Sequence, residues 1–395
     1  MERQVSKRML FREVIVIGAG IAGSSCALQL ARQGFQTLVL DRAQFPRHKT
    51  CGEFLSPEAR EMLDYLDVHI HAHAPGPSHM SHARIILPDG GKIEAPLPGK
   101  AIGISRYHLD CLLHAQLSAA GAEIVTGTVQ NIRRLGPQRY EVTVRQGPEE
   151  VRYEAKAVIG AYGTKQPKNC SGSDSFREST VYVGVKSHYS GIDIPDRVEL
   201  YFNGGGYVGI SPIEEGRVNV AALLPLQAVR GSGTSVPDIL SAAAQGNASL
   251  ADRLAQGVPI NGTQVSVAPL RVSVQPQPWS DFPHVGDALM MIPPLSGDGM
   301  SIALRSALLC AHWTEAYLRG TVNVMEWQQG YTKEAELEFS ALLRRARHMQ
   351  KLAFAPMNRL YPGLVRLFPS LATHIVKATR LSEKGYRVGA VTNKR

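Results

Sequence analysis

A short apolar run, a glycine-rich turn and a helical pattern follow one another near the N-terminus, and they constrain the fold more than any other feature. The run is Val14–Ile17, the turn is Gly18–Gly23, and a second apolar run ends at Asp41. This order of strand, turn, helix and strand is typical of a βαβ unit. The chain is therefore predicted to begin with an α/β domain built on a parallel sheet.

The three glycines of the turn each have a mechanical reason. Gly18 permits the tight turn out of the strand, Gly20 lets the backbone approach a pyrophosphate, and Gly23 lets the helix pack against the strand. The phosphate then lies at a helix N-terminus, which favours an anion. Asp41 ends the second strand, where a carboxylate accepts hydrogen bonds from a ribose. The sequence thus predicts a dinucleotide site in a Rossmann-type domain.

A second glycine-rich loop lies far along the chain, at Val285–Asp287 and Pro293–Met300, just before a helical pattern. A helix N-terminus behind such a loop is a second anion-favouring site. It suits the pyrimidine edge of a reduced flavin, which carries negative charge. The alternative interpretation is an ordinary glycine-rich helix cap.

Three stretches appear in matching order: the turn with Asp41-Arg42, then Phe45–Glu53, and then Gly286-Asp287 with Pro293 and Gly297–Gly299. Together they resemble the FAD-dependent oxidoreductases built like p-hydroxybenzoate hydroxylase. The middle stretch is most similar to the geranylgeranyl reductase and flavin-dependent halogenase branch. The resemblance implies FAD as the cofactor. It leaves NAD(P)H open as the electron donor, because Tyr162 stands where the family usually has an aspartate.

The resemblance also implies a set of cofactor-binding residues. Those near the pyrophosphate, ribose and adenine are Gly18, Gly20, Ala22, Gly23, Asp41, Arg42, Arg106 and Val129. Those near the ribityl chain and the flavin ring are Asp287, Gly297, Gly299 and Met300.

The expected fold is α/β (α+β), with a Rossmann-type FAD-binding domain, an inserted antiparallel-sheet substrate domain and C-terminal helices. A hairpin signal around Pro88–Gly91 and β-like alternation over 179–224 support the insertion. The predicted ranges are 11–75, 100–165 and 280–330 for the FAD-binding domain, 76–99 and 166–279 for the β-rich domain, and 331–395 for a basic helical segment.

Candidate catalytic residues lie in the loop that resembles the family's cofactor-proximal segment. They are Lys49 and Cys51, and Cys51 is either a catalytic thiol or a small buried side chain. Glu53 is either a general base or a capping or surface acid. No metal site is expected from the five histidines in a Pro/Gly/Ala-rich loop, which suggest a lid-like segment; they are His69, His71, His73, His79 and His82.

Composition excludes several classes of protein. The chain has 395 residues, of which 44% are hydrophobic and 19% charged, so it is not a disordered tail protein. It has no run of about 18 apolar residues that would span a membrane, and Met1–Arg12 does not resemble a secretory signal. Five scattered cysteines without a CxxC pair fit a reducing compartment. We expect a cytoplasmic protein, with peripheral attachment to the inner face of the membrane as the alternative.

The net charge of +9 comes entirely from the C-terminal segment, because residues 331–395 hold 13 basic and 4 acidic residues. The remaining body is balanced, which argues against a nucleic-acid partner. The segment is predicted to be helical, with interruptions at Pro356, Pro362 and Pro369. One interpretation is a set of capping helices with a solvated basic face. The other is contact of residues 341–395 with an anionic membrane or an acidic carrier protein.

The favoured function at this level is an FAD-dependent monooxygenase acting on a hydrophobic aromatic or polyketide-like small molecule. A reductase of isoprenoid or enone double bonds is the first alternative, and a non-catalytic FAD-binding module is the second. Halogenation is disfavoured, because Tyr207–Pro212 lacks the tryptophans of the corresponding halogenase segment.

Overall fold

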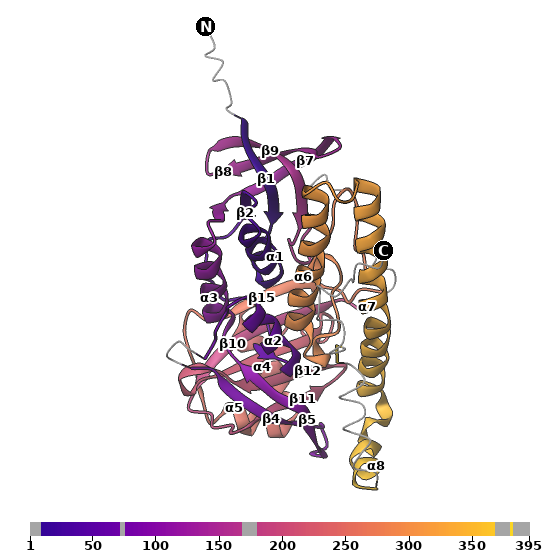
Figure 1. Cartoon of the computed structure of the whole chain (residues 1–395). Coiled ribbons are helices and arrows are strands. Elements are labelled where there is room, and N and C mark those ends of the chain that lie inside the picture. Colours follow the sequence, from indigo (N-terminus) through magenta and orange to yellow (C-terminus); the bar gives the residue numbers. More distant parts are fainter. Residues whose placement is uncertain (1–8, 72–75, 168–179, 368–379, 382–395) are drawn as a thin grey trace.

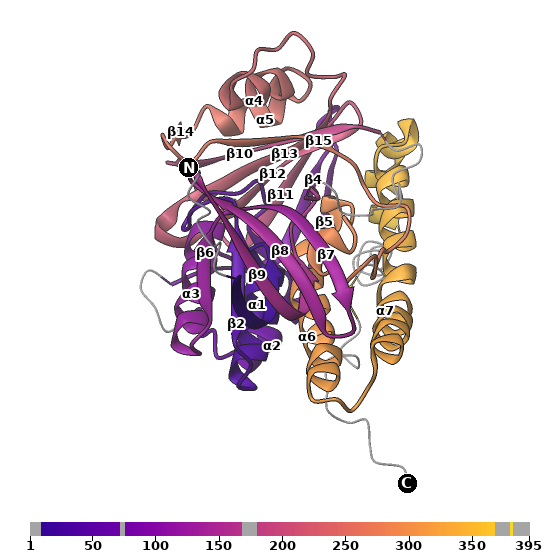
Figure 2. The same cartoon turned by 90° about the horizontal axis from the view of Figure 1, so that it is seen from above.

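The computed structural model describes residues 9–71, 76–167, 180–367 and 380–381. Two sheets organise the chain, and Figures 1 and 2 show them as separate layers with helices α6 and α7 along one side. The expected fold class is confirmed, because a Rossmann-type half and a second, β-rich half are both present.

The first sheet has six strands in the order β6-β2-β1-β9-β8-β7. The first four run parallel, while β8 pairs antiparallel with both β9 and β7. Val14–Ile17 are at most 5% exposed, as expected of a central parallel strand covered on both faces. The strand bounds are β1 Met9–Ile17, β2 Thr37–Asp41, β6 Glu123–Thr126, β7 Thr128–Gly136, β8 Arg139–Gln146 and β9 Glu149–Gly160.

Among the described residues, five α-helices belong to this half of the molecule. Helix α1 packs against α3 and α6, and α7 packs along α6. Their apolar faces share one core with the parallel strands. Helix α7 begins with a capping box between Asn323 and Glu326. The bounds are α1 Ile21–Arg32, α2 Pro57–Tyr65, α3 Arg106–Ala119, α6 Gly299–Leu318 and α7 Val324–Ala353.

The second sheet has nine strands and is antiparallel except where β4 pairs with β11. Helices α4 Val236–Gln245 and α5 Ala248–Leu254 cover its outer face, and the first sheet lies on the other side (Figure 2). The strand bounds are β3 Phe54–Leu55, β4 Ser78–Ile86, β5 Lys92–Gly103, β10 Tyr182–Ser190, β11 Arg197–Asn203, β12 Gly206–Pro212, β13 Val218–Pro225, β14 Val258–Pro259 and β15 Val265–Leu270.

Short 3₁₀ turns complete the fold: η1 Glu214–Gly216, η2 Gly286–Ala288, η3 Pro294–Ser296 and η4 Pro356–Leu360. After η4 the chain continues into α8 Tyr361–Leu367, at the far end of α7 (Figure 1). The chain passes from the first half into the nine-stranded sheet at β3. It returns to the first half after the last residues of β5, where α3 begins. The predicted domain ranges stay a prediction.

Two local expectations were wrong. Pro362 does not interrupt a helix, because it is the second residue of α8, a first-turn position where proline's missing N–H costs nothing. His79 and His82 lie on strand β4 rather than in a loop. Pro369 and His73 lie outside the described residues. Within the part of the chain that the structure describes, no helix has the length and apolarity needed to cross a membrane.

Candidate cofactor and substrate site

The glycine turn between β1 and α1 has the geometry that the sequence predicts. Gly18 has φ +114°, and a Cβ at this position would lie 2.2 Å from the carbonyl oxygen of Ala161. A Cβ at Gly23 would lie 1.8 Å from the carbonyl oxygen of Gly18. Neither position tolerates a side chain, because the atoms it would meet are backbone. These two glycines therefore allow α1 to start against the sheet.

Gly20 differs, because its open side faces cations rather than backbone. A Cβ there would lie 2.9 Å from Lys49 Nζ and 3.7 Å from Arg106 Nη2. Bare backbone at a helix N-terminus with two cations in front is a cradle for a pyrophosphate. The residues present therefore fit the diphosphate of FAD.

Asp41 joins the end of β2 to the turn. Its Oδ2 accepts a hydrogen bond from the Ala19 N–H at 2.9 Å, and its Oδ1 accepts one from the Ala43 N–H at 2.9 Å. Each oxygen keeps accepting capacity for a ribose hydroxyl. Arg42 and Val129 line the same end of the cavity, where the resemblance places adenine.

Arg106 is the third residue after the β5 strand and begins α3, with Ser105 capping the helix. Its guanidinium donates two hydrogen bonds from Nη2 to Asp110, at 2.9 and 3.0 Å. Burial opposes its charge, but the charge of Asp110 prevails and raises the pKa of Arg106. Arg106 therefore stays charged beside the glycine turn.

The second anion-favouring site is formed by η2, η3 and the start of α6. Asp298 occupies the N-cap position of α6 without making a capping hydrogen bond, and nothing lies within 4 Å of where a Cβ of Gly299 would stand. The helix N-terminus is thus open. Asp287 is opposite the cations, and burial raises its pKa although the charges of Lys49 and Arg106 oppose the rise. Gly297, Gly299 and Met300 line the cavity at this point. Gly286 of η2 lies beside the side chain of Ala22 in α1, so this second site adjoins the glycine turn.

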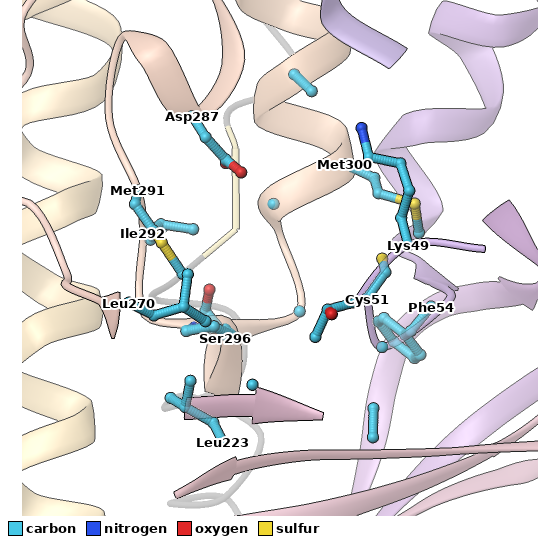
Figure 3. A pocket seen from close by; sticks show the side chains of 18 of the residues that line it. Lys49, Cys51, Phe54, Leu223, Leu270, Asp287, Met291, Ile292, Ser296 and Met300 are labelled. Atoms are coloured by element: carbon cyan, nitrogen blue, oxygen red, sulfur yellow. The ribbon is translucent and has the colours of Figure 1, made fainter. Parts of the chain in front are cut away.

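Lys49 and Cys51, the two candidate catalytic residues, lie on one wall together with Phe54 and Met300, and Asp287, Met291 and Leu270 lie on the opposite wall (Figure 3). Burial, with the charge of Arg106, lowers the pKa of Lys49 to about 8. Burial raises the pKa of the Cys51 thiol, so it is protonated at neutral pH. The geometry at Gly20 places the Lys49 ammonium at the phosphate cradle.

A buried ionic network behind this wall was not predicted from the sequence. Glu53, with no exposed surface and φ +52°, accepts hydrogen bonds from Lys186 Nζ and from His188 Nε2, each at 2.6 Å. The backbone N–H of Arg106 also donates to Glu53, at 2.9 Å. Burial alone raises the pKa of Glu53, but the hydrogen bond from His188 and the charge of Lys186 lower it overall. Glu53 is therefore not a surface acid.

Two further polar contacts tie the same loop to the nine-stranded sheet. Ser211 donates to the Gly52 carbonyl at 2.9 Å, and Asn219 donates to the Cys51 carbonyl at 3.0 Å. The sequence signal was the presence of Lys186 and His188 in a strand, β10, whose first eight residues are all buried. Charged side chains in such a strand require a buried partner.

These walls enclose one continuous cavity of about 1480 Å³. Its polar end contains the cradle, and its other end is an apolar chamber between the nine-stranded sheet and the C-terminal helices (Figure 3). The chamber is lined by aliphatic and aromatic side chains, among them Ile85, Leu87, Ile93, Leu97, Val198, Leu200, Phe202, Tyr207, Leu223 and Leu270.

The histidines predicted not to bind metal are not brought together as a set. His71 stacks on His79 with ring centroids 5.2 Å apart, while His82 pairs with Ser81 and Asp196. Among the described residues, no group of three or more His, Cys, Asp or Glu side chains has the arrangement of a metal site.

Comparisons with known proteins agree with this geometry. The family model of FAD-dependent oxidoreductases matches residues 13–54. The menaquinone reductase of Mycolicibacterium smegmatis is 26% identical, with 76% of this chain and 75% of the relative covered. The geranylgeranyl diphosphate reductase of Rhodobacter capsulatus is 27% identical, with 84% of this chain and 82% of the relative covered.

Among solved structures, the flavin-dependent brominase Bmp2 has the same fold, with a TM-score of 0.77 and 16% identity. The match covers 93% of each chain. The fold, the cradle and the sequence matches agree that this chain is an FAD-dependent oxidoreductase similar to the geranylgeranyl reductases and flavin-dependent halogenases, with FAD as its cofactor.

Proposed function

We propose that this oxidoreductase reduces carbon–carbon double bonds in an isoprenoid chain. The observation that carries the proposal is the apolar chamber that continues directly from the cofactor cradle. Strands β4, β5 and β11 contribute only uncharged side chains to it, such as Ile85, Ile93 and Leu200. A long hydrocarbon chain makes its contacts through apolar surface alone, and it fits such a lining.

The names of the relatives support the same substrate class. The M. smegmatis protein is named for reduction of menaquinone, and the R. capsulatus protein for reduction of geranylgeranyl diphosphate. A further relative, from Methanopyrus kandleri, is named a digeranylgeranylglycerophospholipid reductase and is 28% identical, with 74% of each protein covered.

Cys51 supplies the proton donor that such a reduction needs from the protein. When bound, reduced FAD supplies two electrons and one of the two protons that the double bond gains. Cys51 holds the other proton on Sγ, because its raised pKa keeps the thiol neutral. After the proton moves to carbon, the charge of Arg106 favours the thiolate left behind. Solvent then returns the proton to Sγ.

The test is anaerobic turnover of the FAD-loaded protein. The reduced protein is mixed with geranylgeranyl diphosphate without oxygen, flavin reoxidation is followed by absorbance, and the product is identified by mass spectrometry. We expect reoxidation with a product that has gained two hydrogens. Monooxygenation, which the sequence favours, stays a prediction, and an oxygenated product formed only in air with no anaerobic turnover would establish it instead.

The matched variants are Cys51→Ala and Cys111→Ala. Removing a general acid lowers the rate by about 100-fold or more, so Cys51→Ala should lose the reduction step and keep FAD binding. Cys111 is half-buried on α3 and does not line the cavity, so its replacement should leave the rate unchanged. Equal rates in both variants would remove Cys51 from the mechanism.

A further inference from the structure

The far end of α7, η4 and α8 form an unusual surface. Thirteen large apolar side chains are exposed in the part of the chain that the structure describes, and five of them fall within these sixteen consecutive residues. They are Leu352, Met357, Leu360, Leu364 and Leu367, between 43% and 73% exposed, and we call them the α8 patch. An apolar cluster of this kind marks an interaction site rather than ordinary surface variation.

The charged side chains of the segment that carries the α8 patch have one sign. No aspartate or glutamate occurs between Glu338 and Glu383. Arg344, Arg345, Lys351 and Arg359 are exposed in the same part of the chain. Apolar side chains interleaved with basic ones are the pattern of a segment that lies in the interface of an anionic bilayer.

The α8 patch is also at an opening of the cavity. Leu352 and Leu364 are exposed members of the patch and line the cavity at the same time. Tyr361 and Val365 of α8 pack against Ile93 of β5 and close the chamber on that side. Helix α8 lies at the edge of the molecule, beyond the end of α7 (Figure 1). An apolar molecule leaving a bilayer at the patch would therefore enter the chamber without crossing water.

We propose that the α8 patch and its surrounding cations dock this protein on an anionic phospholipid bilayer, and that the substrate enters from the bilayer between Leu352 and Leu364. The docking rests on the exposed residues alone, while the route of the substrate rests on the proposed function. A bilayer fits better than an acidic carrier protein, because exposed apolar side chains need hydrocarbon. The patch gathers four leucines and one methionine, and two of the leucines line the cavity.

The experiment is cosedimentation of the FAD-loaded protein with phosphatidylcholine vesicles, with and without phosphatidylglycerol. We expect binding to the anionic vesicles that weakens with added salt. The variant Leu360→Asp/Leu367→Asp should bind at least about tenfold more weakly, and Lys351→Gln/Arg359→Gln should lose the preference for phosphatidylglycerol. Neither pair lines the cavity. The matched control is Leu337→Asp, since Leu337 is 73% exposed on α7 outside the patch, and its binding should be unchanged.

Three outcomes overturn the docking: equal binding by the Leu360/Leu367 variant and the Leu337 control, no preference for anionic lipid, or salt-sensitive binding to an acidic carrier protein with none to vesicles. Thermal unfolding of each variant checks that it is folded. The route is tested separately with an isoprenoid lipid in vesicles and with a water-soluble prenyl diphosphate. The Leu360/Leu367 variant should lose reduction of the first substrate only. Vesicle binding without reduction of either substrate would reject the proposed function and leave the docking standing.

Discussion

Replacing Lys186 by methionine should destabilise the protein far more than breaking a surface ion pair. Lys186 and Glu53 both have no exposed side-chain surface and are 2.6 Å apart. Methionine fills a similar volume but leaves the Glu53 carboxylate without its main countercharge. Removing one partner of a buried pair costs roughly 3–5 kcal/mol. Since His188 and the Arg106 N–H still bind Glu53, we expect about 3 kcal/mol, the lower end of that range.

The assay is urea unfolding of the FAD-loaded protein, followed by circular dichroism. The control is Arg139→Met, which breaks the partly exposed Arg139–Glu154 pair and should cost less than about 1 kcal/mol. In the double variant Lys186→Met/Glu53→Gln the uncompensated charge is gone, so part of the lost stability should return. The double variant thus distinguishes a lost charge partner from lost packing.

The pH dependence has a definite sign. The folded-state pKa of Glu53 is lowered from 4.5, so the stability it contributes is present above that value and disappears as the pH falls through the folded-state pKa. The difference between wild type and Lys186→Met should therefore be full at neutral pH and shrink in acid. The reasoning is refuted if Lys186→Met and Arg139→Met lower the free energy of unfolding by the same amount. It is also refuted if the double variant loses as much free energy as the single variants Lys186→Met and Glu53→Gln lose together.

Two further predictions concern the cradle. Gly20→Ala should lower FAD affinity with little change in stability, because its Cβ would meet only the ends of the long side chains of Lys49 and Arg106. Gly136→Ala, whose Cβ would lie in open space, should change neither quantity. Isothermal titration with FAD measures the affinity, and thermal unfolding measures the stability. The pKa of Lys49 is lowered to about 8, so its charge is lost as the pH rises through that value and FAD affinity should fall between about pH 7 and about pH 9. Lys49→Met should bind FAD more weakly and without this dependence, and an unchanged dependence would place the ammonium away from the phosphates.

Local patterns in the sequence were good predictors where the function is itself local. The turn from Gly18 to Gly23 needs only a strand, three glycines and a helix, all within one βαβ unit, and the structure places it as expected. Lys49 is a different case. Its candidate role was catalytic, yet its ammonium faces Gly20, a neighbour 29 positions away that no short-range pattern connects to it.

The sequence by itself determined the FAD-binding half, because helix dipoles, positive-φ glycines and buried parallel strands leave signals within a few residues of one another. It also located the positive charge in the C-terminal segment. Only the tertiary structure decided that Glu53 meets Lys186, 133 positions away, and that Leu352 and Leu364 open the chamber to the surface. Such contacts are made when β10 packs against the loop that carries Glu53, and when α7 and α8 pack against η3 and β5. Packing between distant segments has no periodicity that a sequence displays.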